Sequence, residues 1–172
     1  MTTTVRYLSA ADVSAAMPTI AERLVLAERT LTALVADAEL PAKIGVHPRP
    51  PGSFAHAMPA SLRPRDDATG ATDLLGIKWV TGVPSNRGHD LPAIHAVVVM
   101  SDPATGEPKA ILDGGPITAE RTAAVSGVAI ARFGPTALGR SPRAAIIGAG
   151  VQGYSHVAVL GHVLPGVELV IS

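Results

Sequence analysis

The chain has 172 residues, and its 14 basic and 14 acidic side chains leave no net charge at pH 7. A balanced charge gives no electrostatic basis for binding nucleic acid or an anionic membrane surface. The absence of cysteine excludes disulfides, thiolate metal sites and a cysteine nucleophile. No basic segment followed by an apolar run opens the chain, and the most apolar stretch, residues 93–100, is too short to cross a bilayer. We therefore expect a cytoplasmic protein with neither a membrane nor a nucleic-acid partner.

The first periodic segment lies near the N-terminus. Its apolar residues recur at intervals of three and four positions: Val13, Met17, Ile20, Leu24, Ala27, Leu31 and Leu34. This spacing predicts an amphipathic helix that ends before Pro41. An alternative is that the helix starts at Pro18, because proline is tolerated in a first turn and disrupts a helix interior.

The chain from residue 42 to residue 113 alternates between apolar runs and short polar turns. The connections are short, which favours an antiparallel or mixed sheet. The polar segment 63–73 is expected to be a surface loop. The predicted strands are residues 42–46, 53–60, 74–80, 93–100 and 109–113.

Helical and parallel patterns follow. Residues 117–133 predict a helix with Thr118 as its N-cap. After a linker at 134–142, a strand at 143–147, a helix at 151–163 and a strand at 167–172 predict one parallel strand–helix–strand unit. The fold class is therefore α/β, with a mixed sheet followed by the first βαβ unit of a second, incomplete domain.

A glycine-rich turn lies between the strand and the helix of this unit. Gly148, Gly150 and Gly153 fit the pattern G-x-G-x-x-G. In this motif the first glycine permits a tight turn, the second lets backbone approach a pyrophosphate, and the third permits close packing of helix on strand. The strand before it and the helix after it favour binding of NAD or NADP over a plain turn. Glu168 has about the spacing of a ribose-binding acid, but it starts its strand, whereas that acid belongs at the strand's end.

Three cations occupy unusual positions. Arg121 lies three residues after Thr118, near the positive end of the predicted helix dipole, so it either pairs with Glu120 or another carboxylate or receives an anion. Lys43 and Lys78 lie inside predicted strands, where a buried ammonium needs an anion and an exposed one needs no explanation. The six histidines show no metal-binding spacing, so no metal site is expected.

Several segments share a pattern with one known family. They are GIKWV, PSN, the run LPAIHAVVVMSDPATGEPKAILDGGPITAERTAA and, after it, IIGAGVQG. Together they resemble the ornithine cyclodeaminase/mu-crystallin family over residues 41–172. The resemblance implies a substrate-binding and dimerisation domain at 1–133, followed at 141–172 by the start of an NAD(P)-binding Rossmann domain. It also implies the N-terminal part of a longer protein that is a homodimer when complete.

The resemblance implies an enzyme that transfers a hydride at the α-carbon of an amino or imino acid. In the leading hypothesis, a lyase reaction converts ornithine to proline and ammonia: hydride leaves the substrate, the side-chain amine attacks the imine, ammonia departs and hydride returns. One alternative is a ketimine or imino-acid reductase, or an amino-acid dehydrogenase, on the same scaffold. Another is a non-catalytic, lens-crystallin-like cofactor binder. The 172 residues alone are expected to be inactive.

The resemblance also assigns roles to individual residues. Lys78 is the expected catalytic residue, and it binds the substrate carboxylate together with Lys43 and Arg121. The expected cofactor-binding residues are Arg121, Thr122, Gly148, Gly150, Val151, Gln152 and Gly153.

Three positions depart from the ornithine enzymes of the family. Lys43 stands where they have arginine, which replaces a bidentate carboxylate contact by a point charge. His56 stands where they have an acid, and Ala93 where they have threonine. The aspartate that they use at the amine lies beyond Ser172. These departures weigh against ornithine as the substrate more than against the family.

Overall fold

A computed structural model describes residues 4–134 and 141–172, which leaves most of the expected linker outside the described residues. These residues divide into two compact units. The first unit extends to Ala16 and resumes over Thr32–Pro116. The second comprises Met17–Leu31 and the chain from Ile117 onward.

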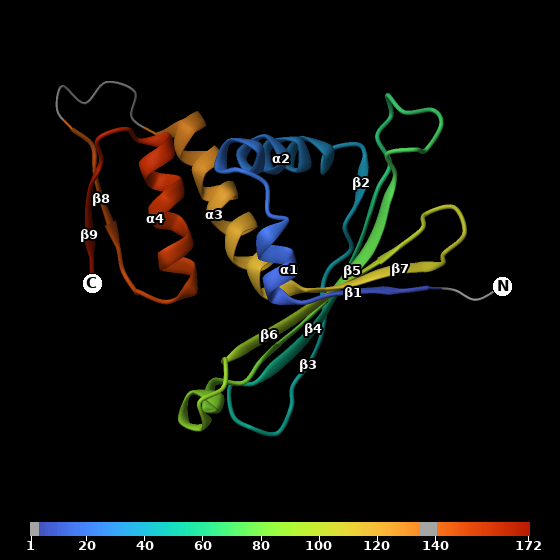
Figure 1. The fold of residues 1–172 in the computed structure, drawn as a ribbon, viewed down its shortest axis with the longest axis horizontal. Helices are drawn as coiled ribbons and strands as arrows, with labels where there is room; N and C mark the ends of the chain where they lie inside the picture. Colours follow the sequence, from blue (N-terminus) through green and yellow to red (C-terminus); the bar gives the residue numbers. More distant parts are fainter. Residues whose placement is uncertain (1–3, 135–140) are drawn as a thin grey trace. The chain divides into compact units, whose positions relative to one another are not determined.

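The first unit is built on a seven-stranded sheet in the order β1-β7-β6-β5-β4-β2, with β3 also paired to β4 (Figure 1). All its strand pairs are antiparallel except β1 with β7, which is parallel. The expectation of a mixed sheet is confirmed. The strands are β1 (Arg6–Leu8), β2 (Ala38–Glu39), β3 (Ile44–Val46), β4 (Phe54–Leu62), β5 (Leu74–Gly82), β6 (Ile94–Ser101) and β7 (Pro108–Asp113), and a 3-10 helix, η1 (Pro84–His89), connects β5 to β6.

The single helix predicted over residues 13–34 is two helices, α1 (Ala10–Ala15) and α2 (Ile20–Ala33). The alternative start near Pro18 is therefore the correct one. Thr19 and Glu22 explain why α2 begins there. The Thr19 hydroxyl accepts a hydrogen bond from the Glu22 N–H (3.3 Å), and the Glu22 carboxylate accepts one from the Thr19 N–H (2.9 Å). Such a capping box satisfies backbone donors at the start of a helix.

The next helix, α3 (Gly114–Phe133), starts directly after β7 and earlier than predicted. The Asp113 carboxylate accepts a hydrogen bond from the Gly115 N–H (2.8 Å) and caps the helix. Thr118 is therefore not the N-cap, and that prediction is wrong. Arg121 lies about two turns inside α3, so the expectation that it meets the helix dipole is wrong as well, because the dipole acts mainly within the first turn.

The second unit contains the predicted parallel strand–helix–strand arrangement. Its elements are β8 (Arg143–Ile146), α4 (Val151–Val163) and β9 (Glu168–Ile171), and β8 pairs with β9 in parallel. Helices α2 and α4 both pack on α3 at Gly127, where an added Cβ would lie 2.7 Å from Leu24 and 2.6 Å from Val159. Small buried residues, Ala119, Ala123 and Ala124, belong to the same helix and allow this close approach.

Candidate functional site

The glycine turn between β8 and α4 meets three separate physical requirements. Gly148 has φ of 101°, in the left-handed region that side chains disfavour, and its N–H donates to the Ser172 carbonyl (2.7 Å). An added Cβ at Gly150 would have no atom within 4 Å, so this position is open. An added Cβ at Gly153 would overlap the Gly148 carbonyl oxygen. The first glycine thus supplies the turn, the second supplies open space and the third permits close packing.

The first turn of α4 presents backbone donors to this open space. Gly150 is the N-cap and provides no side-chain hydrogen bond, and the first turn contains no acidic residue. Val151 and Gln152 are exposed there. Free N–H groups at a helix N-terminus, together with the helix dipole, bind phosphate groups. The residues present therefore fit the pyrophosphate of a dinucleotide.

Helix α3 lies alongside α4, and both run in the same direction in Figure 1. A hydrogen bond of 2.9 Å joins Nε2 of His156 on α4 to the Ser126 hydroxyl on α3. Thr122 and Gln152 each precede this pair by four residues, about one helical turn. The helix pair therefore places Thr122, an expected cofactor residue, level with the first turn of α4.

Arg121 is exposed next to Thr122. Glu120 forms an ion pair with Arg23, and their side chains are only 27% and 15% exposed. The alternative in which Glu120 pairs with Arg121 is therefore wrong. Within residues 4–134 and 141–172 Arg121 forms no ion pair, so its guanidinium is available to an anion.

In the first unit, the strand register places His56 and Lys78 on one face of the sheet, and Lys43, just before β3, continues the same alternation. Lys78 on β5 lies opposite Met58 on β4, and His56 is two residues before Met58, so both side chains share a face. His56 pairs with Gly45 of β3, and Lys43 is two residues before Gly45. Neighbouring strands are about 5 Å apart, so the two lysines start from backbone about 10 Å apart across β4. We call this surface the Lys78 face.

The His56 ring has a defined position on the Lys78 face. It stacks on Phe54, with ring centroids 4.6 Å apart and planes inclined by 24°. Glycines on both neighbouring strands make room for these rings. A Cβ at Gly45 would lie 2.8 Å from the His56 ring, and one at Gly82 would overlap the Phe54 ring. Sequence reasoning missed this arrangement, although alternation along β4 already placed Phe54 and His56 on one face.

Electrostatics on this face favour a neutral imidazole. Burial, followed by the positive charges of Lys43 and His47, lowers the pKa of His56 below its usual value. The described strand positions on the Lys78 face of β4 to β7 include no carboxylate. They are Phe54, His56, Met58, Ala60 and Leu62 on β4; Leu74, Gly76, Lys78, Val80 and Gly82 on β5; Ile94, Ala96, Val98 and Met100 on β6; and Ala110 and Leu112 on β7.

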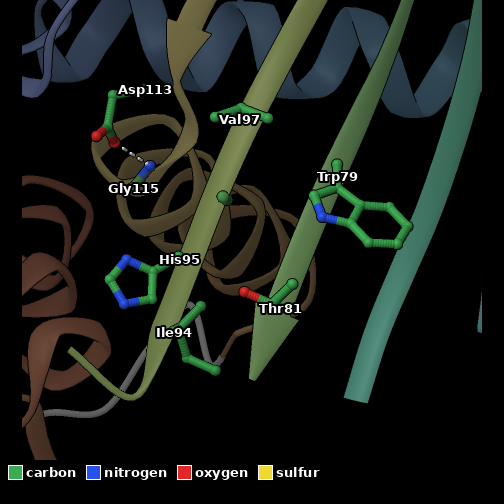
Figure 2. Close-up of a pocket in the computed structure, with 8 residues that line it drawn as sticks. Trp79, Thr81, Ile94, His95, Val97, Asp113 and Gly115 are labelled. Carbon is green, nitrogen blue, oxygen red and sulfur yellow. Dashed lines mark hydrogen bonds between the residues drawn. The ribbon is translucent and has the colours of Figure 1, made fainter. Parts of the chain in front are cut away.

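A cavity of about 350 Å³ lies on the opposite face of the same sheet (Figure 2). Trp79 follows Lys78 directly and therefore points the other way. Figure 2 shows Trp79 and Thr81 on β5 beside His95 and Val97 on β6. Most of the cavity lining thus comes from the side away from Lys78, although Ile94 and Ala96 of the Lys78 face also line it. Its lining comprises Trp79, Thr81, Ile94, His95, Ala96, Val97, Asp113 and Gly115.

Membrane-spanning helices and metal-ligand clusters are both absent from the described residues. None of the helices there combines the length and apolar character that crossing a membrane requires. No cluster of three or more metal-ligating side chains was found in the same part of the chain.

The fold and the glycine turn define an α/β protein with a Rossmann-type strand–helix–strand unit. Residues 2–171 match the model of the ornithine cyclodeaminase/mu-crystallin family. The chain belongs to this family, and the resemblance drawn from its motifs is confirmed.

One curated relative matches nearly the whole chain. Nodulation efficiency protein NfeD of Rhizobium meliloti is 39% identical over 165 residues, which are 95% of this chain and 48% of that protein. The chain thus spans about half the length of this relative.

Two solved structures share the fold over 97% of the chain. A Δ1-pyrroline-2-carboxylate reductase of Thermococcus litoralis, in complex with NADH and L-proline, has a TM-score of 0.83 and 29% identity, and 49% of it is covered. An archaeal alanine dehydrogenase dimer with bound NAD has a TM-score of 0.79 and 27% identity, and 48% of it is covered.

Lys78 and Arg121, both expected at the substrate carboxylate, belong to different compact units. The structure brings Lys43 and Lys78 to one face of the first unit, and Thr122 to the level of the glycine turn in the second.

Proposed function

We propose that the whole protein binds NAD or NADP at the Gly148 turn and transfers a hydride at the α-carbon of a small amino or imino acid. The observation that carries this proposal is the different requirement at each of Gly148, Gly150 and Gly153, which together leave an open, backbone-lined anion site. Both solved relatives described above contain a nicotinamide dinucleotide.

The cofactor supplies the hydride acceptor or donor, and the chain supplies its binding site. Backbone N–H groups at Val151 and Gln152 face the pyrophosphate, and Thr122 lies level with them. Arg121 contributes a positive charge that can serve either the cofactor or the substrate carboxylate. The geometry of the α4 N-terminus supports the pyrophosphate site. The ion pair between Arg23 and Glu120 supports the role of Arg121, because Glu120 already has a partner.

The Lys78 face holds the substrate in this proposal. Lys78 is the catalytic residue in the sense that it contacts the substrate: its ammonium, with that of Lys43, binds the carboxylate and orients the α-carbon. Correct orientation of two reacting groups removes much of the entropic barrier to reaction. The first domain, proposed over residues 1–133, thus carries the substrate, and residues 141–172 begin the cofactor domain.

Two reactions are compatible with this arrangement. Cyclodeamination of ornithine needs a substrate with a second ammonium group. The described strand positions of the Lys78 face offer no carboxylate to that group, so an acid from elsewhere in the protein has to meet it. The alternative, reduction of a cyclic imino acid, is supported by the reductase that shares the fold. A non-catalytic cofactor binder is the third candidate.

We propose further that the protein is a cytoplasmic homodimer. Four apolar side chains on the cavity side of the sheet are exposed: Tyr7 (68%), Ile44 (68%), Val46 (57%) and Trp79 (41%). The register places all four on one face, and apolar faces of this kind commonly mark subunit interfaces. The archaeal alanine dehydrogenase is itself a dimer.

The test uses the full-length protein with two mixtures. Δ1-pyrroline-2-carboxylate with NADH or NADPH should give a steady fall in nicotinamide absorbance if the enzyme is a reductase. Ornithine with catalytic NAD should give proline and ammonia without net absorbance change if it is a cyclodeaminase.

Retained cofactor binding without turnover of these two substrates, or of other small amino and imino acids, would indicate the non-catalytic role. Absence of NAD(P) binding would overturn the proposal itself.

A further inference from the structure

His156 on α4 makes hydrogen bonds with both of its ring nitrogens. Nδ1 lies 2.6 Å from the backbone carbonyl oxygen of Gln152, and Nε2 lies 2.9 Å from the Ser126 hydroxyl on α3. A carbonyl oxygen only accepts, so Nδ1 carries the proton. In the neutral ring Nε2 then accepts from the Ser126 hydroxyl. One side chain thus connects the first turn of α4 to a neighbouring helix.

The position of this connection matters more than its number of bonds. Gln152 is in the turn whose N–H groups face the open space at Gly150. Ser126 is one turn beyond Thr122 on α3. The His156 bridge therefore fixes the two walls proposed for the pyrophosphate site relative to each other, although His156 itself lies a turn away from that site.

Packing at Gly127 provides a separate attachment between the same helices. Val159 packs against Gly127 and is only 1% exposed. This apolar contact lies farther from the glycine turn than the His156 bridge does along α4. Loss of the bridge should therefore leave the helices packed together while it loosens the first turn of α4.

We propose that His156 is a positioning residue for the dinucleotide and acts through Gln152 and Ser126. This inference rests on the proposed function, namely that the Gly148 turn binds NAD or NADP. Rigid placement of groups around a binding site preserves affinity because little order must be created on binding.

The experiment measures the dissociation constant of NADH and NADPH on the full-length protein by titration calorimetry, together with steady-state kinetics. We expect His156→Ala to weaken cofactor binding about tenfold and to raise the KM for cofactor. The kcat and the KM for the imino-acid substrate should change much less. Ser126→Ala should reproduce the cofactor effect, because it removes the other half of the bridge.

A double-mutant cycle provides the decisive readout. If the two residues act through one bridge, the His156→Ala and Ser126→Ala double variant should bind cofactor about as weakly as either single variant. Additive losses, near a hundredfold in total, would overturn the inference. His156→Gln keeps an amide that can reach toward Ser126, so this variant should bind the cofactor more tightly than His156→Ala does.

His162→Ala is the matched control, since His162 is an exposed residue of the same helix and forms no part of the bridge. It should leave the dissociation constant unchanged. Wild-type protein that binds neither NADH nor NADPH would refute the proposed function. Wild-type protein that binds normally, with unaltered affinity in His156→Ala, would refute the positioning role alone.

Discussion

The glycine turn and the Lys78 face recognise ligands by different means. At Gly148, Gly150 and Gly153 the important feature is the absence of side chains, because the backbone itself makes the turn, the opening and the helix contact. On the Lys78 face recognition depends on the side chains of His56 on β4, Lys78 on β5 and Lys43, which lies just before β3.

This difference determines how each region tolerates substitution. A backbone-built site is sensitive to any added Cβ, and the sensitivity depends on the space at each position. A site built from side chains keeps its fold when a charge is removed but loses its ligand. A substitution in the glycine turn should therefore change stability according to the space at that glycine. Removal of a charge on the Lys78 face should weaken ligand binding and leave stability nearly unchanged.

The largest effect is expected at Gly153. Gly153→Ala places a methyl group on the Gly148 carbonyl oxygen, so the turn or α4 must shift. We expect a loss of about 3 kcal/mol in the free energy of unfolding, measured by urea denaturation, since overpacking against rigid backbone is costly. Cofactor binding should be lost together with stability.

Gly150→Ala is the matched comparison in the same turn. The backbone of Gly150 suits any residue, with φ of −78° and ψ of −173°, and its added Cβ meets no atom. Stability should change by no more than about 1 kcal/mol, the usual scale of an N-cap change. Cofactor affinity should still fall, because the methyl group occupies the space proposed for phosphate. Equal destabilisation by both substitutions would contradict the separate roles of the two glycines.

The sequence predicted the glycine turn well because its signal is local. Three glycines within six residues, between an apolar strand and a helix, identify a structure whose parts are adjacent in the chain. The strands β3 to β7 were likewise predicted from apolar runs. The starts of α2 and α3 were misplaced or left open because capping by Thr19 and Asp113 competes with hydrophobic periodicity in setting a helix boundary.

The Lys78 face was harder to predict from the sequence, because the strand register decides which side chains share that face. A shift of one residue moves every side chain to the other face of a sheet. Motifs singled out Lys43 and Lys78 individually, but their shared face with His56 depends on pairings between separate segments. The His156–Ser126 bridge was missed for the same reason, since it joins two side chains that are 30 residues apart in the chain.

Lys78→Met tests the Lys78 face, and its effect should be on the reaction and not on the free energy of unfolding. A hydrogen bond to a charged group contributes about 1.5–3 kcal/mol, so kcat/KM should fall roughly tenfold to a hundredfold. The cofactor dissociation constant and the midpoint of unfolding should change little. Lys109→Met is the control, because this exposed lysine on β7 pairs with Glu107 and such surface pairs contribute little. Loss of cofactor binding in Lys78→Met would contradict the proposal that the glycine turn binds the cofactor and the Lys78 face binds the substrate.

The smallest effect concerns the protonation of His56. Burial is the main cause of its lowered pKa, and the Lys43 charge is the next. Lys43→Met should therefore raise the pKa of His56 part of the way toward its usual value, as measured by NMR titration of the ring protons. Lys109→Met should leave the titration unchanged.

The lowered pKa of His56 also has a consequence for stability. Below the ordinary histidine pKa the unfolded chain binds a proton that the folded protein still resists, so the free energy of unfolding falls as the pH drops through this window. Because Lys43→Met narrows the window, the variant should lose less stability on acidification than the wild type does. An unchanged His56 titration in Lys43→Met would place the two side chains on different sides of the sheet. The substrate carboxylate would then have Lys78 alone on that face of the first unit.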